Sequence, residues 1–118
     1  MGFSSFEDLE VWKKSCRLAV RIYQVLDGCR DYGLKDQMTR AAVSISSNIA
    51  EGSERNSIKD FVRFLHIAKG SSAELRTQVY ISGKIGLLEK EIQQEITKEL
   101  VSISKMLHKL IRSLQPST

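Results

Sequence analysis

The sequence predicts an all-α protein, folded as a single antiparallel up-down-up-down four-helix bundle over residues 1–118. Apolar residues recur at helical spacing almost throughout the chain, and no stretch alternates with period two beside a hairpin turn. The composition, 42% hydrophobic and 27% charged with a single proline, is typical of one globular domain. Four helical segments are separated by short connections, which favour antiparallel neighbours.

The first helix is expected over about residues 7–27. Ser5 and Asp8 form an acidic capping-box pattern before it, and Gly28 is placed to end it, because glycine tolerates left-handed backbone. The core face predicted from spacings of three and four consists of Leu9, Trp12, Cys16, Ala19, Tyr23 and Leu26. Further apolar residues lie off this face, at Val11, Leu18, Ile22 and Val25. So wide an apolar surface either covers a second neighbour inside the bundle or forms an oligomer contact, and we favour self-association.

The second helix is expected over about residues 34–51, after an entry at Tyr32-Gly33. Its predicted inward residues are small to medium in size: Leu34, Met38, Ala41 or Ala42, Ile45 and Ile49. Gly52 is well placed to terminate this helix.

The third helix is expected over about residues 57–84, and Ser57 with Asp60 forms its capping-box pattern. Its predicted core face consists of Phe61, Leu65, Ala68, Ser72, Leu75 and Val79. Gly70 lies in mid-helix, where glycine costs about 1 kcal/mol relative to alanine. This position therefore implies close backbone packing or the approach of a ligand.

The fourth helix is expected over about residues 89–114, and Pro116 stops it. Its core face has the most regular pattern: Ile92, Ile96, Leu100, Ile103, Leu107, Leu110 and Leu114. Val101 and Ile111 lie off this face and add to the surface expected for self-association.

Several segments, in order and at their spacings, resemble the family known as the 23S rRNA intervening-sequence proteins, named for members encoded inside insertions in bacterial 23S rRNA genes. The segments that carry the resemblance are residues 6–12 (FEDLEVW), 32–37 (YGLKDQ), 40–45 (RAAVSI), 48–52 (NIAEG), 64–71 (FLHIAKGS) and 74–78 (ELRTQ). The chain departs from the family where a proline often precedes the Tyr-Gly-Leu string, since residues 28–31 read GCRD.

The resemblance implies an antiparallel four-helix bundle that commonly assembles as a ring-like homopentamer. The function of the family is poorly defined. Accessory proteins of diversity-generating retroelements are similar basic pentameric bundles that work with a reverse transcriptase and RNA, so the resemblance implies nucleic-acid association by analogy.

The basic residues favour a non-catalytic homo-oligomer that binds structured RNA or other nucleic acid. The net charge of +4 per chain would become +20 in a ring of five copies, enough to hold a phosphate backbone by counterion release. The candidate phosphate contacts are Lys59, Arg63 and Lys69, followed by Lys13, Arg17 and Arg21. No aromatic residue interleaves with the basic stripes, so base stacking is not expected. Solvated helix faces are the plain alternative, and a scaffold that docks a partner protein without touching nucleic acid is the alternative function.

A set of polar residues lies in or beside the resembling segments of the second and third helices. Its members are Arg40, Asn48, Glu51, Arg55, Ser71, Glu74 and Gln78. We interpret them as an internal or inter-subunit network in which Arg40 or Arg55 pairs with Glu51 or Glu74, because buried polar groups need partners. The alternative interpretation is a polar ligand pocket.

Catalysis, cofactors and metals have no support in the sequence. His66 and His108 lack the Glu-x-x-His spacing of a di-metal bundle, and no phosphate loop or nucleophile elbow occurs. Cys16 and Cys29 are interpreted as structural thiols. The beginning of the chain does not read as a secretory signal, and no window is apolar enough for a membrane span, so a cytoplasmic protein without a membrane partner is expected.

Overall fold

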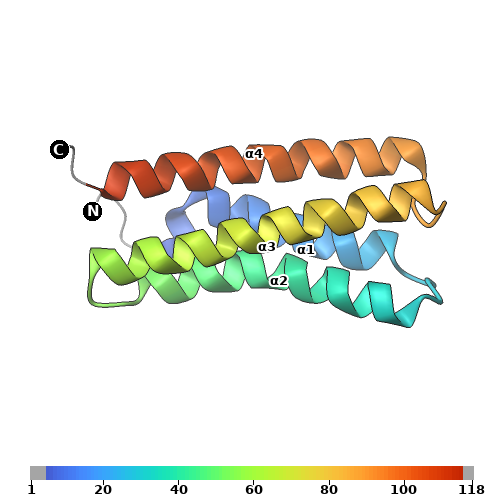
Figure 1. Cartoon of the computed structure of the whole chain (residues 1–118). Helices are drawn as coiled ribbons and strands as arrows, with labels where there is room; N and C mark the ends of the chain where they lie inside the picture. Colours follow the sequence, from blue (N-terminus) through green and yellow to red (C-terminus); the bar gives the residue numbers. More distant parts are fainter. Residues whose placement is uncertain (1–4, 116–118) are drawn as a thin grey trace.

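A computed structural model describes residues 5–115, which fold as four α-helices preceded by one 3-10 turn, with no strand in this range. The elements are η1 (Phe6–Asp8), α1 (Glu10–Val25), α2 (Tyr32–Ser53), α3 (Ile58–Lys84) and α4 (Lys90–Leu114). Successive helices run in opposite directions along a common long axis, in a molecule of 46 × 23 × 20 Å (Figure 1). The predicted all-α four-helix bundle is confirmed. The expected stop at Pro116 lies outside the described residues.

The chain enters α1 through η1, so this helix begins at Glu10 rather than near residue 7. The Ser5 hydroxyl oxygen accepts the Glu7 backbone N–H at 3.0 Å and caps η1 instead of α1. Leu9 is extended and breaks the helix between them. The Phe6 ring meets the edge of Trp12 with 5.2 Å between ring centroids, which holds the turn against α1.

Ala19 and Leu26 of the predicted first core face are buried as expected, but the rest of that face is displaced by about one residue. The buried residues of this helix are Val11, Ser15, Leu18, Ala19 and Ile22. Tyr23 is 53% exposed, while Trp12 and Cys16 are only half-buried. Ser15 is tolerated in the core because its hydroxyl donates to the Val11 carbonyl at 2.6 Å. Of the aliphatic residues expected to drive self-association, Val11, Leu18, Ile22 and Ile111 therefore fill the interior of the bundle, whereas Val25 and Val101 are half-buried.

α2 is longer than predicted at both ends. Gly28 has a φ of +78° and turns the chain out of α1, as expected, and the Asp31 carboxylate then accepts the Leu34 N–H at 3.1 Å to cap α2. Gly52 does not terminate α2, which continues through Ser53. A Cβ added at Gly52 would lie 2.6 Å from the Cβ of Phe64, so this glycine allows α2 and α3 to approach closely.

α3 begins as predicted, with the Ser57 hydroxyl accepting the Asp60 N–H at 3.1 Å, and its predicted core face is buried. Close backbone packing at Gly70 is wrong, because an added Cβ there would meet nothing within 4 Å, and the approach of a ligand stays a prediction. The closely packed glycine of this helix is Gly83, where a Cβ would lie 2.8 Å from Cγ of Gln93 on α4.

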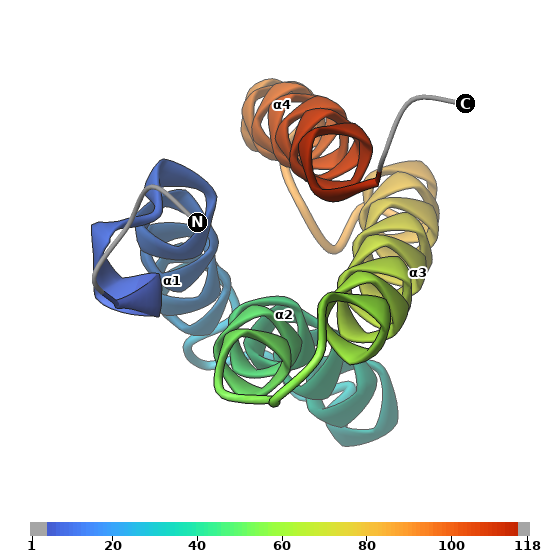
Figure 2. The ribbon, with the colours of Figure 1, turned by 90° about the vertical axis from the view of Figure 1, so that its left-hand side faces the viewer.

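The four helices form a closed circuit in which α1 and α3 lie diagonally opposite, as seen down the long axis in Figure 2. α2 and α3 share the most extensive contact, and α1 and α4 share the least of the adjacent pairs. The core is lined along α4 by Ile96, Leu100, Ile103 and Leu107. Within residues 5–115, no helix contains an apolar segment long enough to span a lipid bilayer.

Candidate nucleic-acid interface

The six predicted phosphate contacts do not gather on one surface. Lys13, Arg17 and Arg21 lie on α1, which does not contact α3, where the other three lie. The Lys13 ammonium is 3.5 Å from the Glu10 carboxylate, and Arg17 is exposed. The Arg21 guanidinium binds the Glu95 carboxylate on α4 and lies 3.7 Å from that of Glu99. Arg21 thus links α1 to α4, and its charge is largely neutralised.

Lys59 and Arg63 lie at the start of α3, beside the α2–α3 connection. Lys59 is exposed, and Arg63 Nε lies 3.7 Å from the Asp60 carboxylate. The Arg63 guanidinium also stacks 4.7 Å from the Phe64 ring centroid, while that of Arg55 lies 4.8 Å from the same centroid. Cation–π contacts of this kind hold the two arginines in place beside a buried ring.

Lys69 lies in a shallow trough between α3 and α4. The trough consists of three adjoining hollows of about 360, 310 and 280 Å³. The first two share Arg76 as a lining residue, and the last two share Tyr80 and Gln93. We call this surface the α3–α4 trough and define it by Lys69, Arg76, Tyr80, Lys84, Lys90, Gln93, Lys105 and His108.

The α3–α4 trough is strongly cationic. Among the described residues, its lining includes five lysines and arginines and no aspartate or glutamate. None of these five cations forms an ion pair with another residue of the range 5–115; the closest polar contact of Lys69 is the His108 Nδ1 atom, 3.4 Å from its ammonium. Unpaired like charges repel one another, so a bound polyanion would stabilise this arrangement.

Three acidic residues in the middle of α3 and α4 lie toward other faces. Glu95 and Glu99 contact Arg21 on the α1 side, whereas Glu74 lines a hollow of about 250 Å³ on the α2 side together with Gln37, Arg40 and Ser44. This segregation leaves the α3–α4 trough without a compensating carboxylate.

The sequence reasoning missed most of this surface. Lys69 and Arg76 are seven residues apart, as are Lys98, Lys105 and Arg112, and this spacing keeps each set on one side of its helix. The spacing of these basic residues does not show which side of α3 packs beside α4. The sequence also places an aromatic residue among these cations. Tyr80 is four residues from both Arg76 and Lys84, so all three lie on one side of a helix.

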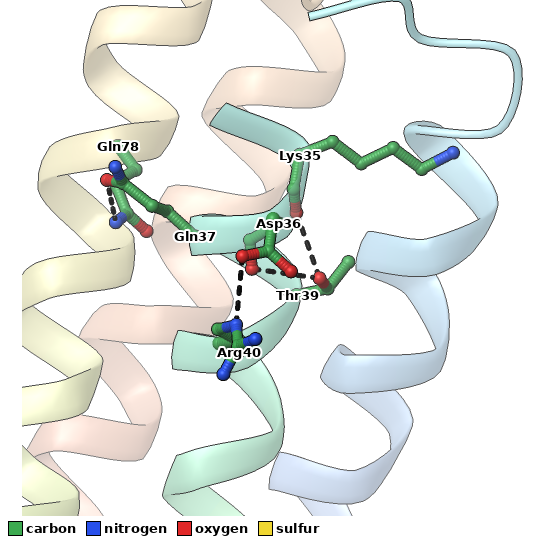
Figure 3. Close-up of polar contacts among 6 residues, drawn as sticks. All are labelled: Lys35, Asp36, Gln37, Thr39, Arg40 and Gln78. Atoms are coloured by element: carbon green, nitrogen blue, oxygen red, sulfur yellow. Dashed lines mark hydrogen bonds and ion pairs between the residues drawn. The ribbon is translucent and has the colours of Figure 1, made fainter. Parts of the chain in front are cut away.

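The predicted polar network consists of several separate local contacts on α2 and α3, and its two arginines pair within their own segment. Arg40 pairs with Asp36 (Nε to Oδ2, 2.9 Å) rather than with Glu51 or Glu74, because Asp36 is one turn away on the same helix (Figure 3). Arg55 pairs with Glu51 at 2.9 Å.

Two polar contacts join the helices directly. The Ser44 hydroxyl of α2 and the Ser71 hydroxyl of α3 are 2.8 Å apart, and within α2 the Asn48 amide donates to the Ser44 carbonyl at 2.8 Å. Nearer the start of α2, the Gln78 amide donates to the Gln37 carbonyl oxygen at 3.5 Å (Figure 3). Glu74 is exposed beside them. The network therefore fixes the register of α2 against α3 with small side chains, and its arginines stay on the surface.

The outward surface of the same two helices carries exposed apolar side chains. We call it the α2–α3 outer face and define it by Arg40, Val43, Ser44, Ile67, Glu74 and Ile81. Ile67 and Ile81 lie seven residues before and after Glu74, on one side of α3, and are 42% and 44% exposed. Apolar side chains beside mixed charges are typical of a protein–protein contact.

The described residues hold no group of three or more His, Cys, Asp and Glu side chains placed to bind a metal ion. Cys16 and Cys29 are free thiols, both half-buried.

Comparison with known proteins gives a family and a solved relative. The family model described as "23S rRNA-intervening sequence protein" matches residues 7–109. A crystal structure of a protein of unknown function from the S23 ribosomal protein family of Bacteroides thetaiotaomicron VPI-5482 is similar, with a TM-score of 0.81 and 28% sequence identity. The similarity covers 86% of this chain and 97% of that one. No curated protein matches the chain.

Proposed function

The chain belongs to the 23S rRNA-intervening sequence protein family, and on that basis we propose that it is a non-catalytic, homo-oligomeric bundle that binds structured RNA or other nucleic acid. The observation that carries this proposal is the α3–α4 trough, where five cations lie without a carboxylate among the lining residues. A phosphate backbone supplies the missing negative charge at regular spacing, and its binding releases condensed counterions.

The geometry favours an extended polyanion over a small anion. Lys69 and Lys84 are fifteen residues apart on α3, which corresponds to about 22 Å at about 1.5 Å per residue. That length matches roughly six nucleotides of a helical strand at about 3.4 Å each. Lys105 on α4 contributes to the same surface from the opposite wall.

Self-association supports the proposal through the α2–α3 outer face. A contact made there would cover Ile67 and Ile81. Each copy in a closed ring uses two different faces, so the proposal requires that the second face also lies outside the α3–α4 trough. A closed ring of five copies, which the family resemblance implies, would carry +20 in total and present the trough five times. Repetition raises the affinity for a long polyanion through multivalency.

The test is the binding of nuclease-treated protein to a labelled structured rRNA fragment across a salt series, with the native mass recorded on the same sample. We expect one oligomeric species whose affinity falls steeply with salt. The double variant Lys69→Gln/Lys105→Gln should flatten the dependence of log K on log salt by roughly one unit per lost phosphate contact.

The matched control is Lys109→Gln, which removes a lysine of α4 that lines a different hollow, near the start of α1. Its salt dependence should stay close to that of the parent protein. If the double variant keeps the parental dependence of log K on log salt, the α3–α4 trough is not the surface that binds nucleic acid. Absence of binding at low salt overturns nucleic-acid binding, and recovery of one stoichiometric protein partner after nuclease treatment would then establish the alternative scaffold function.

A further inference from the structure

One end of the α3–α4 trough carries an exposed aromatic ring among its cations. Tyr80 is 57% exposed and lines two adjoining hollows, so its ring lies between them. Arg76 and Lys84 lie one helical turn before and after it on the same side of α3. The expectation that no aromatic residue interleaves with the basic stripes concerned other basic residues, and Arg76 and Lys84 were not among the predicted contacts.

The surroundings of Tyr80 place positive charge on both sides of the ring. The Lys84 ammonium lies 5.5 Å from the ring centroid, over one face. Arg76 lines the hollow of about 310 Å³ on one side, and Lys90 at the start of α4 lines the hollow of about 280 Å³ on the other. Unlike the other exposed tyrosines, this ring lies among several unpaired cations and lines two hollows, so it offers a stacking surface beside positive charge.

Gln93 adds a hydrogen-bonding group beside the ring. It lines both hollows and lies against Gly83, where any side chain would displace it. Its amide makes no hydrogen bond to another residue in the part of the chain described. An amide offers both a donor and an acceptor, which is what the edge of a nucleobase requires.

We propose that the Tyr80 end of the α3–α4 trough binds an unpaired nucleotide of single-stranded nucleic acid. The base stacks on the Tyr80 ring, the Gln93 amide hydrogen-bonds to the base edge, and Arg76, Lys84 and Lys90 hold the flanking phosphates. A base inside a duplex cannot present its face to a protein ring, so this end selects single-stranded segments. The inference rests on the proposed function, because the neighbouring Lys69–Lys105 part of the trough holds the adjoining backbone.

The test measures fluorescence anisotropy with three labelled probes of equal length: an unstructured RNA strand, the same strand with abasic residues, and an RNA duplex. Tyr80→Ala should weaken binding of the base-bearing strand about 5- to 150-fold, the range that stacking contributes per base. Tyr80→Phe should bind like the parent protein, because phenylalanine keeps the stacking surface. The abasic strand should bind the parent at least as weakly as the normal strand binds Tyr80→Ala, because it lacks both the stacking face and the base edge that Gln93 contacts.

The matched control is Tyr23→Ala, which removes a tyrosine on α1 that is similarly exposed, at 53%. It should leave all three affinities unchanged. Tyr80 is at the surface, so its variants should fold, and the helical circular dichroism of each variant checks this. As a second readout, the ring protons of Tyr80 should move upfield in NMR spectra when the base-bearing strand binds and stay in place with the abasic strand.

Two outcomes separate this inference from the function on which it rests. If Tyr80→Ala binds the strand like the parent while Lys69→Gln/Lys105→Gln loses affinity, base stacking is overturned and the cationic trough stands. If the parent binds none of the probes at low salt, the proposed function and this inference fall together.

Discussion

At the scale of single residues, two glycines set the distances between helices. Gly52 on α2 faces Phe64, and Gly83 on α3 faces Gln93, whereas Gly70 faces open space. All three lie within helices, Gly70 in the middle of α3 and the other two next to the last residue of α2 and of α3. The sequence could therefore predict that some helical glycines pack closely, but not which ones, because the answer depends on the neighbouring helix.

This difference predicts opposite effects of alanine at two glycines. Gly52→Ala should lower the free energy of unfolding by about 1–3 kcal/mol, because the new methyl group collides with Phe64. Gly70→Ala should raise it by about 0.5–1 kcal/mol, because alanine favours the helix and meets no neighbour there. Urea unfolding followed by circular dichroism measures both. Equal stabilities of the two variants would show that α2 and α3 are not held at the close distance described here.

At the scale of elements, the predictability of each helix depended on how many apolar repeats it carries. α3 and α4 have one dominant repeat each, and the buried residues follow it closely. α1 carries two overlapping repeats, one through Trp12 and Tyr23 and one through Leu18 and Ile22, and only the second turns inward. A single helix does not decide between them, because the choice depends on where α2 and α4 lie.

The stability of the contact between α1 and α4 should depend on an ion pair that joins these two helices. α1 and α4 share the least contact of the adjacent pairs, and Arg21 bridges them to Glu95 and Glu99. Arg21→Gln should lower the free energy of unfolding in urea by about 1 kcal/mol, the upper end for a partly exposed pair, and added salt should shrink the difference.

Arg40→Gln is the matched control, since it breaks the more exposed Asp36 pair within α2. It should cost no more than about 0.5 kcal/mol. If both variants lose the same stability, the bridge between α1 and α4 contributes nothing beyond an ordinary surface pair.

At the scale of the whole molecule, the candidate site depends on packing that the sequence does not contain. The basic stripes of α3 and α4 are visible as heptad spacings, yet they become one surface only because particular flanks of the two helices meet. The same packing turns Glu95 and Glu99 toward α1 and Glu74 toward α2. Lys69 alone of the six predicted contacts lies in the α3–α4 trough, because the prediction considered each helix by itself.

The α2–α3 outer face predicts how the molecule assembles. Ile67→Glu/Ile81→Glu places two carboxylates on this face, where burial against a second copy would leave them unpaired, so the native mass should fall to that of one chain. Sedimentation velocity measures this across a concentration series. The monomer should keep the α3–α4 trough and bind a short strand normally, but lose affinity for a long RNA by about 100-fold or more, since multivalency disappears.

Val20→Glu provides the control for this assembly, because Val20 is an exposed apolar residue, 57% accessible, on α1. It introduces one carboxylate, against two in the double variant, on α1, which does not contact α3, and should leave the oligomer intact. If Val20→Glu dissociates the oligomer and the double variant does not, the contact between copies lies on α1, and the apolar residues of the α2–α3 outer face serve another partner. If neither dissociates it, both faces stay exposed in the assembly, and the α3–α4 trough itself becomes the surface to test for contact between copies.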